Sequence, residues 1–138
     1  VRKKNIIHIK KLNDLFKISD IISIHVHVTS ETNQMINANV LKYAKKNLIL
    51  INTSRGEIIN ESETCKFLSK NKNSKVYVDV LADEINDKFN SCLYKYFKNQ
   101  KTSQVFITPH IGGMTKEAQI TAYTHAAKLL INFKNKKI

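Results

Sequence analysis

Three short apolar segments of this chain each end in polar residues whose types could carry out chemistry. A guanidinium (Arg55) follows the first, carboxylates (Asp79 and Glu84) follow the second, and an imidazole (His110) follows the third. Buried parallel strands present side chains in this way, because the carboxyl ends of such strands meet at one edge of a sheet. A guanidinium, a carboxylate and an imidazole at one edge could bind a small anionic substrate and move a proton on it.

The sequence around these residues predicts alternating strands and helices. Apolar runs predict strands over 6–9, 21–26, 48–51, 75–80 and 105–108. Periodicity and capping residues predict helices over 12–18, from Asn37 or Asn39 to 44, over 60–69, and from Thr115 to about 133. The apolar stripe of the last helix is expected to pack in a core. The polar stretch 83–104 is expected to be a mostly irregular surface excursion whose aromatic residues pack on the domain. The alternation indicates an α/β fold, with a Rossmann-like parallel sheet and helices on both of its faces.

The composition indicates one globular domain without a membrane segment. The chain has 138 residues and 42% hydrophobic content, enough for a core, and no apolar run approaches the ~18 residues of a membrane-spanning helix. The net charge of +12 raises the possibility of nucleic-acid binding. The basic residues are nearly all lysines, scattered along the chain without interleaved aromatic residues. This pattern argues against a specific nucleic-acid partner.

The cysteines and the first residue of the chain lead to two further expectations. Cys65 and Cys92 lie in unrelated contexts and form no metal or redox pattern, so we expect free thiols in a reducing, cytoplasmic compartment and no metal site. Because the chain begins with Val1, we expect it to be a piece of a longer protein.

Four blocks of the sequence, in order and with compatible spacing, resemble the NAD-dependent D-isomer-specific 2-hydroxyacid dehydrogenases over about residues 12–133. The blocks are Ser19–Val26, Asn52–Gly56, Val78–Val80 with Glu84, and Thr108–Gly113. The resemblance implies an oxidoreductase that uses NAD, a small 2-hydroxy or 2-keto acid as substrate, and a homo-oligomer. Within the family, the segment 111–119 and the insert around 89–93 look most like the members that convert 3-phosphoglycerate to 3-phosphohydroxypyruvate in L-serine biosynthesis.

The resemblance also implies roles for individual residues. His110 would exchange a proton with the C2 oxygen of the substrate, and Glu84 would hydrogen-bond His110 and fix its tautomer. Arg55 would bind the substrate carboxylate and polarise the C2 carbonyl, so Arg55, Glu84 and His110 are the expected catalytic residues. Asp79 would bind the nicotinamide carboxamide. The full set expected to bind the cofactor is Thr53, Ser54, Arg55, Asp79, His110, Ile111, Gly112 and Gly113.

Several of these assignments have alternatives. Asp79 could simply cap the turn that follows it. Asp83 and Asp87 lie close to Glu84 in the sequence, so Glu84 could be a solvent-exposed carboxylate like these two, without a special role. The whole protein could instead be a relative that acts on lactate or glyoxylate. It could also be a non-catalytic NAD-binding domain, resembling a corepressor or a remnant of an enzyme.

The sequence departs from the family pattern mainly by an absence. The chain has only three glycines, so it contains no Gly-x-Gly-x-x-Gly turn for the pyrophosphate, and the acidic residue for the adenosine ribose is also missing. Residues 1–138 are therefore predicted to be the C-terminal half of a NAD-binding domain, a partial domain that lacks the glycine-rich first βαβ unit. We expect the isolated chain to bind NAD weakly and to turn over substrate poorly or not at all.

Overall fold

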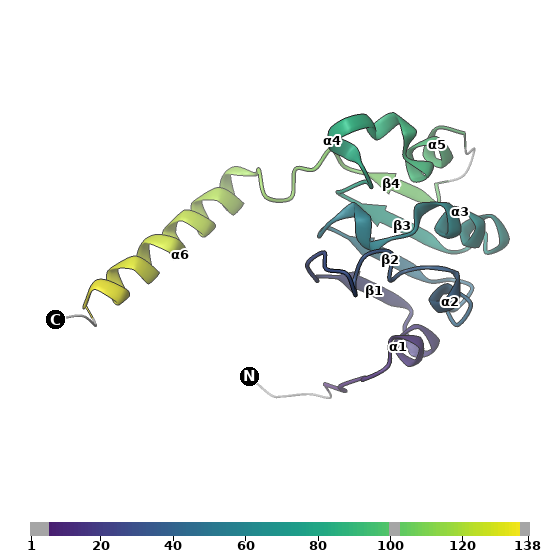
Figure 1. Ribbon diagram of the computed structural model, residues 1–138, viewed down its shortest axis with the longest axis horizontal. Helices are drawn as coiled ribbons and strands as arrows, with labels where there is room; N and C mark the ends of the chain where they lie inside the picture. The colour runs from purple at the N-terminus through teal and green to yellow at the C-terminus, as the bar shows by residue number, and fades with distance from the viewer. Residues whose placement is uncertain (1–5, 100–102, 136–138) are drawn as a thin grey trace. The chain divides into compact units, whose positions relative to one another are not determined.

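The computed structural model describes residues 6–99 and 103–135. The chain divides into two compact units, the first ending at Thr108 and the second beginning at Pro109. The first unit contains a parallel four-stranded sheet (Figure 1) with the strands in the order β1 (Ile21–Ile24), β2 (Ile49–Asn52), β3 (Lys75–Val78) and β4 (Val105–Ile107). This sheet confirms the prediction of a Rossmann-like α/β fold.

One helix precedes the first strand, and the other helices of the first unit connect its strands. The helices are α1 (Leu12–Ile18), α2 (Ala38–Leu41), α3 (Glu61–Lys70), α4 (Glu84–Asp87) and α5 (Cys92–Asn99), with short 3-10 turns η1 (Gly56–Ile58) and η2 (Lys88–Asn90). Asn37 caps α2 by accepting a hydrogen bond from the backbone of Asn39, and Asn60 caps α3 by accepting one from Glu63. These caps confirm the predicted helix starts, because an amide side chain replaces the missing partner of an N-terminal N–H group.

The helices α1, α2, α3 and α5 follow one another across one face of the sheet (Figure 1), and each contacts the next. Strand residues that face them, such as Ile24, Leu50 and Val76, are buried, whereas Ile21 and Phe106 on the alternate positions are 59% and 37% exposed. The expectation of helices on both faces also involves the helix of the second unit and stays a prediction, while the helices α1, α2, α3 and α5 of the first unit thus lie on one face. The physical reason is the strand order, because right-handed crossovers that always step in the same direction place every helix on the same side.

Two expectations for the first unit are wrong. Residues 6–9 form no strand, and Ile6 and Ile7 are 88% and 75% exposed. A strand at this place has no neighbouring strand, among the described residues, to accept its backbone hydrogen bonds. The described part of the stretch 83–104 is mostly helical and not irregular, because Leu93 is buried and anchors α5, while Tyr94 and Tyr96 pack against the core as expected.

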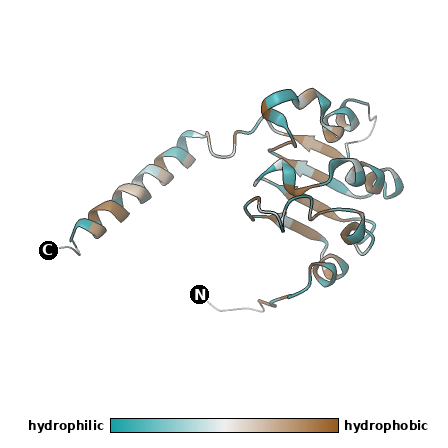
Figure 2. Ribbon diagram, viewed as in Figure 1, coloured by the Kyte–Doolittle hydropathy of each residue, from teal (hydrophilic) through white to brown (hydrophobic). Residues whose placement is uncertain are grey.

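The second unit contains one long helix, α6 (Lys116–Asn135), whose start is capped by the Thr115 hydroxyl accepting from the backbone of Ala118. Figure 2 shows that apolar residues recur along α6 as well as in the strands. Within the second unit taken by itself, none of the α6 side chains is buried, and Leu130 and Phe133 are 69% and 60% exposed. The expectation that its apolar stripe packs in a core concerns contacts of this helix with other parts of the protein and stays a prediction. Within the described residues, no helix is both long and apolar enough to cross a membrane.

Candidate active site at the carboxyl edge of the sheet

The parallel register sets the strand ends at one level. Ile24 of β1 pairs with Asn52 of β2, Asn52 pairs with Val78 of β3, and Val78 pairs with Ile107 of β4. The residues that follow these four therefore leave the sheet along one edge, as the sequence predicts. In open α/β sheets this carboxyl edge is where ligands bind.

The loop after β2 holds Arg55 through a buried asparagine. The Asn52 side chain is fully buried, its Nδ2 donates to the Arg55 carbonyl oxygen at 2.8 Å, and its Oδ1 accepts from the Ser54 backbone at 3.0 Å. Ser54 Oγ also donates to the carbonyl oxygen of Ile24 on the neighbouring strand at 2.7 Å. The Arg55 side chain itself is exposed, and Nη1 donates to the Ser54 carbonyl oxygen at 2.7 Å. A rigid loop thus presents a guanidinium, which retains enough N–H donors to bind a carboxylate with two hydrogen bonds.

Asp79 lies at the end of β3 and is 7% exposed. Its backbone N–H donates to the Asn52 carbonyl oxygen at 3.0 Å, and its Oδ1 accepts from Thr108 Oγ1 at 2.5 Å. This hydroxyl ties the carboxylate to the segment that leaves β4. A carboxylate fixed between two strand ends is an acceptor suited to the amide N–H₂ of a nicotinamide. The chemistry of this edge therefore fits the nicotinamide half of the cofactor.

Glu84 is half-buried at the start of α4, and its Oε2 accepts from the Leu81 backbone at 3.0 Å. The two alternatives, Asp83 and Asp87, are exposed, and both accept hydrogen bonds from residues of their own segment. Asp83 also has a left-handed backbone with φ of 57°. Glu84 thus differs from Asp83 and Asp87 in burial, and its catalytic role stays a prediction.

Gly56 brings the Arg55 loop against the segment that carries Glu84. A Cβ atom added at Gly56 would lie 2.0 Å from the carbonyl carbon of Leu81 and 2.2 Å from the backbone nitrogen of Ala82. Only glycine permits backbones to approach so closely. The motif in which glycine follows arginine therefore has a steric reason in this fold.

The remaining predicted residues belong to the second unit. His110, Ile111, Gly112 and Gly113 follow Pro109, and all four are exposed. His110 has a left-handed backbone with φ of 54°, which few non-glycine residues adopt. The first unit alone brings together Thr53, Ser54, Arg55, Asp79 and Glu84.

Two polar residues near this edge have structural roles that the sequence did not reveal. Asn52 and Glu61 are both buried, at 0% and 7% exposure. Asn52 is the last residue of an apolar strand, and a polar residue at this position could have indicated a role in holding the loop that follows. Glu61 directly follows the helix cap Asn60, where an acidic residue is expected only to favour the helix dipole.

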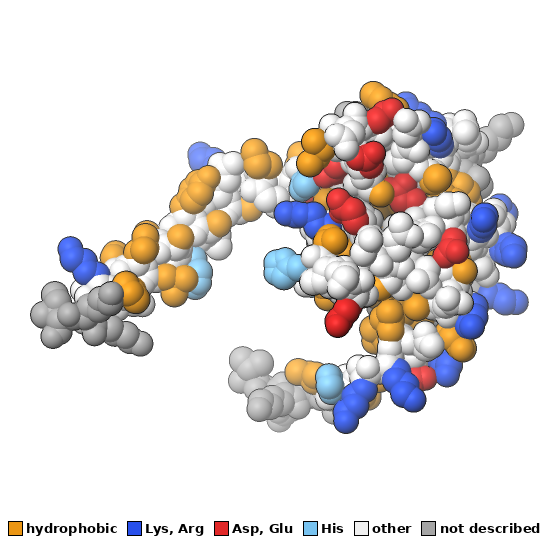
Figure 3. All heavy atoms as spheres, in the orientation of Figure 1, with side chains coloured by type: hydrophobic (Ala, Val, Ile, Leu, Met, Phe, Trp, Pro, Cys, Tyr) orange, Lys and Arg blue, Asp and Glu red, His pale blue; other side chains and the backbone are white. Residues whose placement is uncertain are grey.

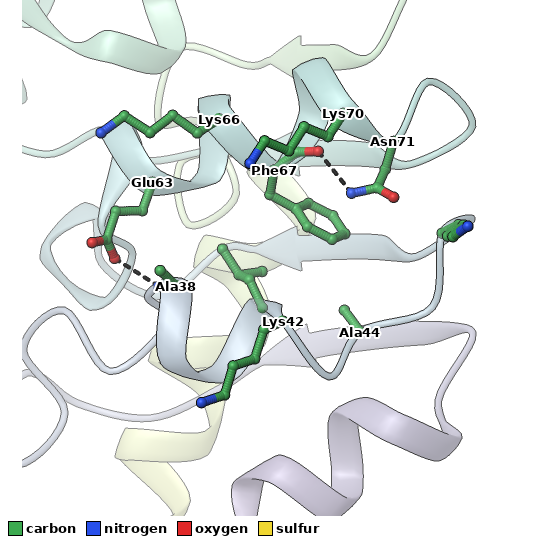
Figure 4. Close-up of a pocket in the computed structure, with 10 residues that line it drawn as sticks. Ala38, Lys42, Ala44, Glu63, Lys66, Phe67, Lys70 and Asn71 are labelled. Atoms are coloured by element: carbon green, nitrogen blue, oxygen red, sulfur yellow. Dashed lines mark hydrogen bonds between the residues drawn. The ribbon is translucent and has the colours of Figure 1, made fainter.

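A separate hollow of about 460 Å³ lies between α2 and α3 (Figure 4). Leu41 and Phe67 form apolar parts of its lining, and Lys42, Lys66 and Lys70 are among the residues around it. None of the residues predicted for the active site lines this hollow. On the face drawn in Figure 3, lysine and arginine side chains are spread over many elements and do not form one patch.

Comparison with known proteins agrees with this fold. Residues 1–112 match the family described as D-isomer specific 2-hydroxyacid dehydrogenase, NAD binding domain. The chain is 32% identical over 132 residues to D-3-phosphoglycerate dehydrogenase of Escherichia coli (strain K12), covering 94% of this chain and 31% of that protein. It is 40% identical over 119 residues to glyoxylate reductase of Thermococcus litoralis, covering 86% of this chain and 34% of that protein.

A solved structure shows the same fold. D-lactate dehydrogenase with NAD⁺ from Lactobacillus jensenii superposes with a TM-score of 0.67 at 27% identity, covering 78% of this chain and 34% of that chain. The chain therefore belongs to the D-isomer-specific 2-hydroxyacid dehydrogenase family, within its NAD-binding domain, and NAD is the cofactor of that domain. The chain spans about a third of the length of the curated relatives that it matches.

Proposed function

We propose that this chain forms the nicotinamide side of the cofactor domain of an enzyme that interconverts a D-2-hydroxyacid and its 2-keto acid. The observation that carries the proposal is the strand register, which aligns the ends of β2 and β3 before Arg55 and Asp79. The close approach of Gly56 to Leu81 and Ala82, which precede Glu84, supports the same site. The absence of a Gly-x-Gly-x-x-Gly turn from the sequence supports a partial domain over residues 1–138.

In this proposal each residue has a distinct task. Arg55 binds the substrate carboxylate and polarises the C2 carbonyl, because its guanidinium is always charged and offers parallel N–H donors. Asp79 accepts a hydrogen bond from the nicotinamide carboxamide, beside the backbones of Thr53 and Ser54 and of residues 110–113. NAD, when bound, accepts or supplies the hydride. His110 takes or gives the proton at the C2 oxygen, and Glu84 holds its imidazole in the required tautomer.

We propose 3-phosphoglycerate and 3-phosphohydroxypyruvate as the substrate pair, in L-serine biosynthesis. Similarity over nearly the whole chain to the Escherichia coli 3-phosphoglycerate dehydrogenase supports this choice. Glyoxylate is the second candidate, because identity to the Thermococcus litoralis glyoxylate reductase is higher, at 40%. Homo-oligomerisation and a cytoplasmic location stay predictions of the same proposal.

The test is NADH oxidation by the full-length protein that contains this chain, with 3-phosphohydroxypyruvate, pyruvate and glyoxylate in parallel. Wild type is compared with His110→Asn and with His125→Asn, a matched control on the exposed α6 helix. We expect turnover of the phosphorylated keto acid, a loss of roughly 10²- to 10⁴-fold in His110→Asn, and no loss in His125→Asn.

The other outcomes discriminate between the candidates. Turnover confined to glyoxylate or pyruvate would reassign the substrate within the family. A folded protein that binds NADH but reduces none of the three keto acids would favour a non-catalytic NAD-binding domain and would refute the proposed activity.

A further inference from the structure

A buried carboxylate on α3 contacts both ends of the segment that carries Glu84. Glu61 Oε1 accepts from the Ala82 backbone N–H at 2.9 Å. Glu61 Oε2 accepts from Ser91 Oγ at 2.7 Å and from the Leu93 backbone N–H at 3.3 Å. One side chain therefore holds both ends of the shorter segment 82–91, which contains α4 and η2 and is called the excursion from here on.

No side chain of α4 is buried, and Phe89 packs edge-on against Tyr94 of α5 with 5.4 Å between the ring centroids. Ile85 is 94% exposed and Phe89 is 59% exposed, whereas Glu61 is only 7% exposed. A buried carboxylate persists in a fold when hydrogen-bond donors compensate for its lost hydration. In this fold, the donors come from the excursion and from the start of α5, so satisfying the carboxylate also places the excursion.

The contact lies next to Glu84. Ala82 is two residues before Glu84, and the preceding residue, Leu81, donates its backbone N–H to Glu84 Oε2 at 3.0 Å. The same backbone unit packs against Gly56, beside Arg55. Glu61 holds the Ala82 peptide in place and thereby also positions Leu81, whose N–H binds the Glu84 carboxylate. The same contact sets how closely Leu81 and Ala82 approach the Arg55 loop at Gly56.

We propose that Glu61 is a positioning residue for Glu84, a role that rests on the proposed function. Glu61 does not touch substrate or cofactor and acts through the excursion. Both oxygens of the carboxylate are required, because each accepts a hydrogen bond from a different end of the excursion. In Glu61→Gln the amide N–H₂ replaces one of these acceptors and faces either the Ala82 N–H or the donors of Ser91 and Leu93. One end of the excursion is then released.

The chain offers a matched control on the same helix. Glu63 lies two residues after Glu61, and its Oε2 accepts from the Ala38 backbone N–H at 2.6 Å. Glu63→Gln therefore perturbs an acceptor of the same chemical kind on the same helix, but this acceptor binds α2 and not the excursion. Any difference between the two variants reports on the link to Glu84.

The experiment uses the full-length protein and measures keto-acid reduction and amide hydrogen exchange in wild type, Glu61→Gln and Glu63→Gln. We expect kcat to fall about 10- to 100-fold in Glu61→Gln, the scale of a catalytic group displaced by about 1 Å, with a much smaller change in KM. Glu63→Gln retains kcat. In Glu61→Gln the amide at the released end, either that of Ala82 or that of Leu93, exchanges faster than in wild type, whereas neither amide does so in Glu63→Gln.

A double variant tests whether Glu61 acts through Glu84. In a Glu84→Gln background, Glu61→Gln should cause little further loss of kcat, because residues that act as a unit are not additive. Additive losses would show a general structural effect and overturn the inference. Should Glu61→Gln fail to fold, Ser91→Ala removes one donor while leaving the carboxylate. A kcat for Ser91→Ala equal to that of wild type would then overturn the inference.

Failure of the inference and failure of the proposed function give different results. An active wild type with equal kcat in Glu61→Gln and Glu63→Gln overturns the positioning role alone. A wild type that reduces no keto acid overturns the proposed function and, with it, any catalytic role for the Glu61 contacts.

Discussion

Replacing Gly56 by alanine is expected to destabilise the protein and to move Arg55 away from the segment that carries Glu84. The added Cβ would lie 2.0 Å from the carbonyl carbon of Leu81, whereas ordinary contact begins at 3.4 Å. One backbone must therefore retreat by about 1.4 Å. The opposing atoms belong to the backbone, so rotation of a side chain cannot relieve the contact.

The expected cost follows from this displacement. Overpacking of a well-packed interior costs about 1–3 kcal/mol of stability. Because the atoms that clash with the new Cβ belong to the backbone, we expect Gly56→Ala to lower the free energy of unfolding by about 3 kcal/mol. For a protein with domains of ordinary size, this corresponds to a fall in Tm of roughly 6–12 °C. Because Arg55 precedes Gly56, kcat/KM for the keto acid should fall as well, by about 100-fold for a displacement of about 1 Å.

The control is Gly113→Ala, because a Cβ added at Gly113 meets nothing within 4 Å and its φ is not left-handed. Thermal unfolding of the two variants, followed by circular dichroism, gives the comparison. We expect Gly113→Ala to unfold at or slightly above the wild-type temperature, since alanine at a compatible site restricts the unfolded chain. Equal Tm values for Gly56→Ala and Gly113→Ala would refute the close approach at Gly56.

Three further predictions concern other residues of the chain. Arg55→Lys should lower kcat/KM about 100-fold, because an ammonium cannot donate two parallel hydrogen bonds to a carboxylate; steady-state kinetics with a loss below about threefold would contradict the role. Burial, together with the neighbouring Cys92 and Glu61, raises the pKa of Cys65 to about 12. Iodoacetamide at pH 8 should therefore label exposed Cys92 and spare Cys65, and equal labelling of the two in peptide mass spectra would refute the raised pKa. Ionisation of Cys65 should also lower the stability of the fold as pH rises above 9.0, the pKa of this thiol in the unfolded chain. Asn60→Ala removes the cap of α3 and should cost about 0.5–2 kcal/mol in urea unfolding, whereas an unchanged midpoint would show that the cap contributes nothing.

The sequence alone predicted the features that depend on neighbouring residues. The four paired strands, the helix starts at Asn37 or Asn39, at Asn60 and at Thr115, and the polar residues after each strand follow from local patterns of apolarity and capping. The edge where Arg55 and Asp79 meet also followed, because parallel strands align their carboxyl ends.

The tertiary structure decided the features that depend on residues distant in the sequence. In the printed sequence Glu61 is one acidic residue of a helix start, as Glu63 is, and only the fold shows that Glu61 is buried against the excursion that carries Glu84. Gly56 is a glycine after an arginine in the sequence, and its steric necessity arises from Leu81, which belongs to another loop. The face that α1, α2, α3 and α5 cover follows from the strand order, which local propensity does not encode. Burial and close backbone contact are set by which segments meet, and this information becomes available only when the chain has folded.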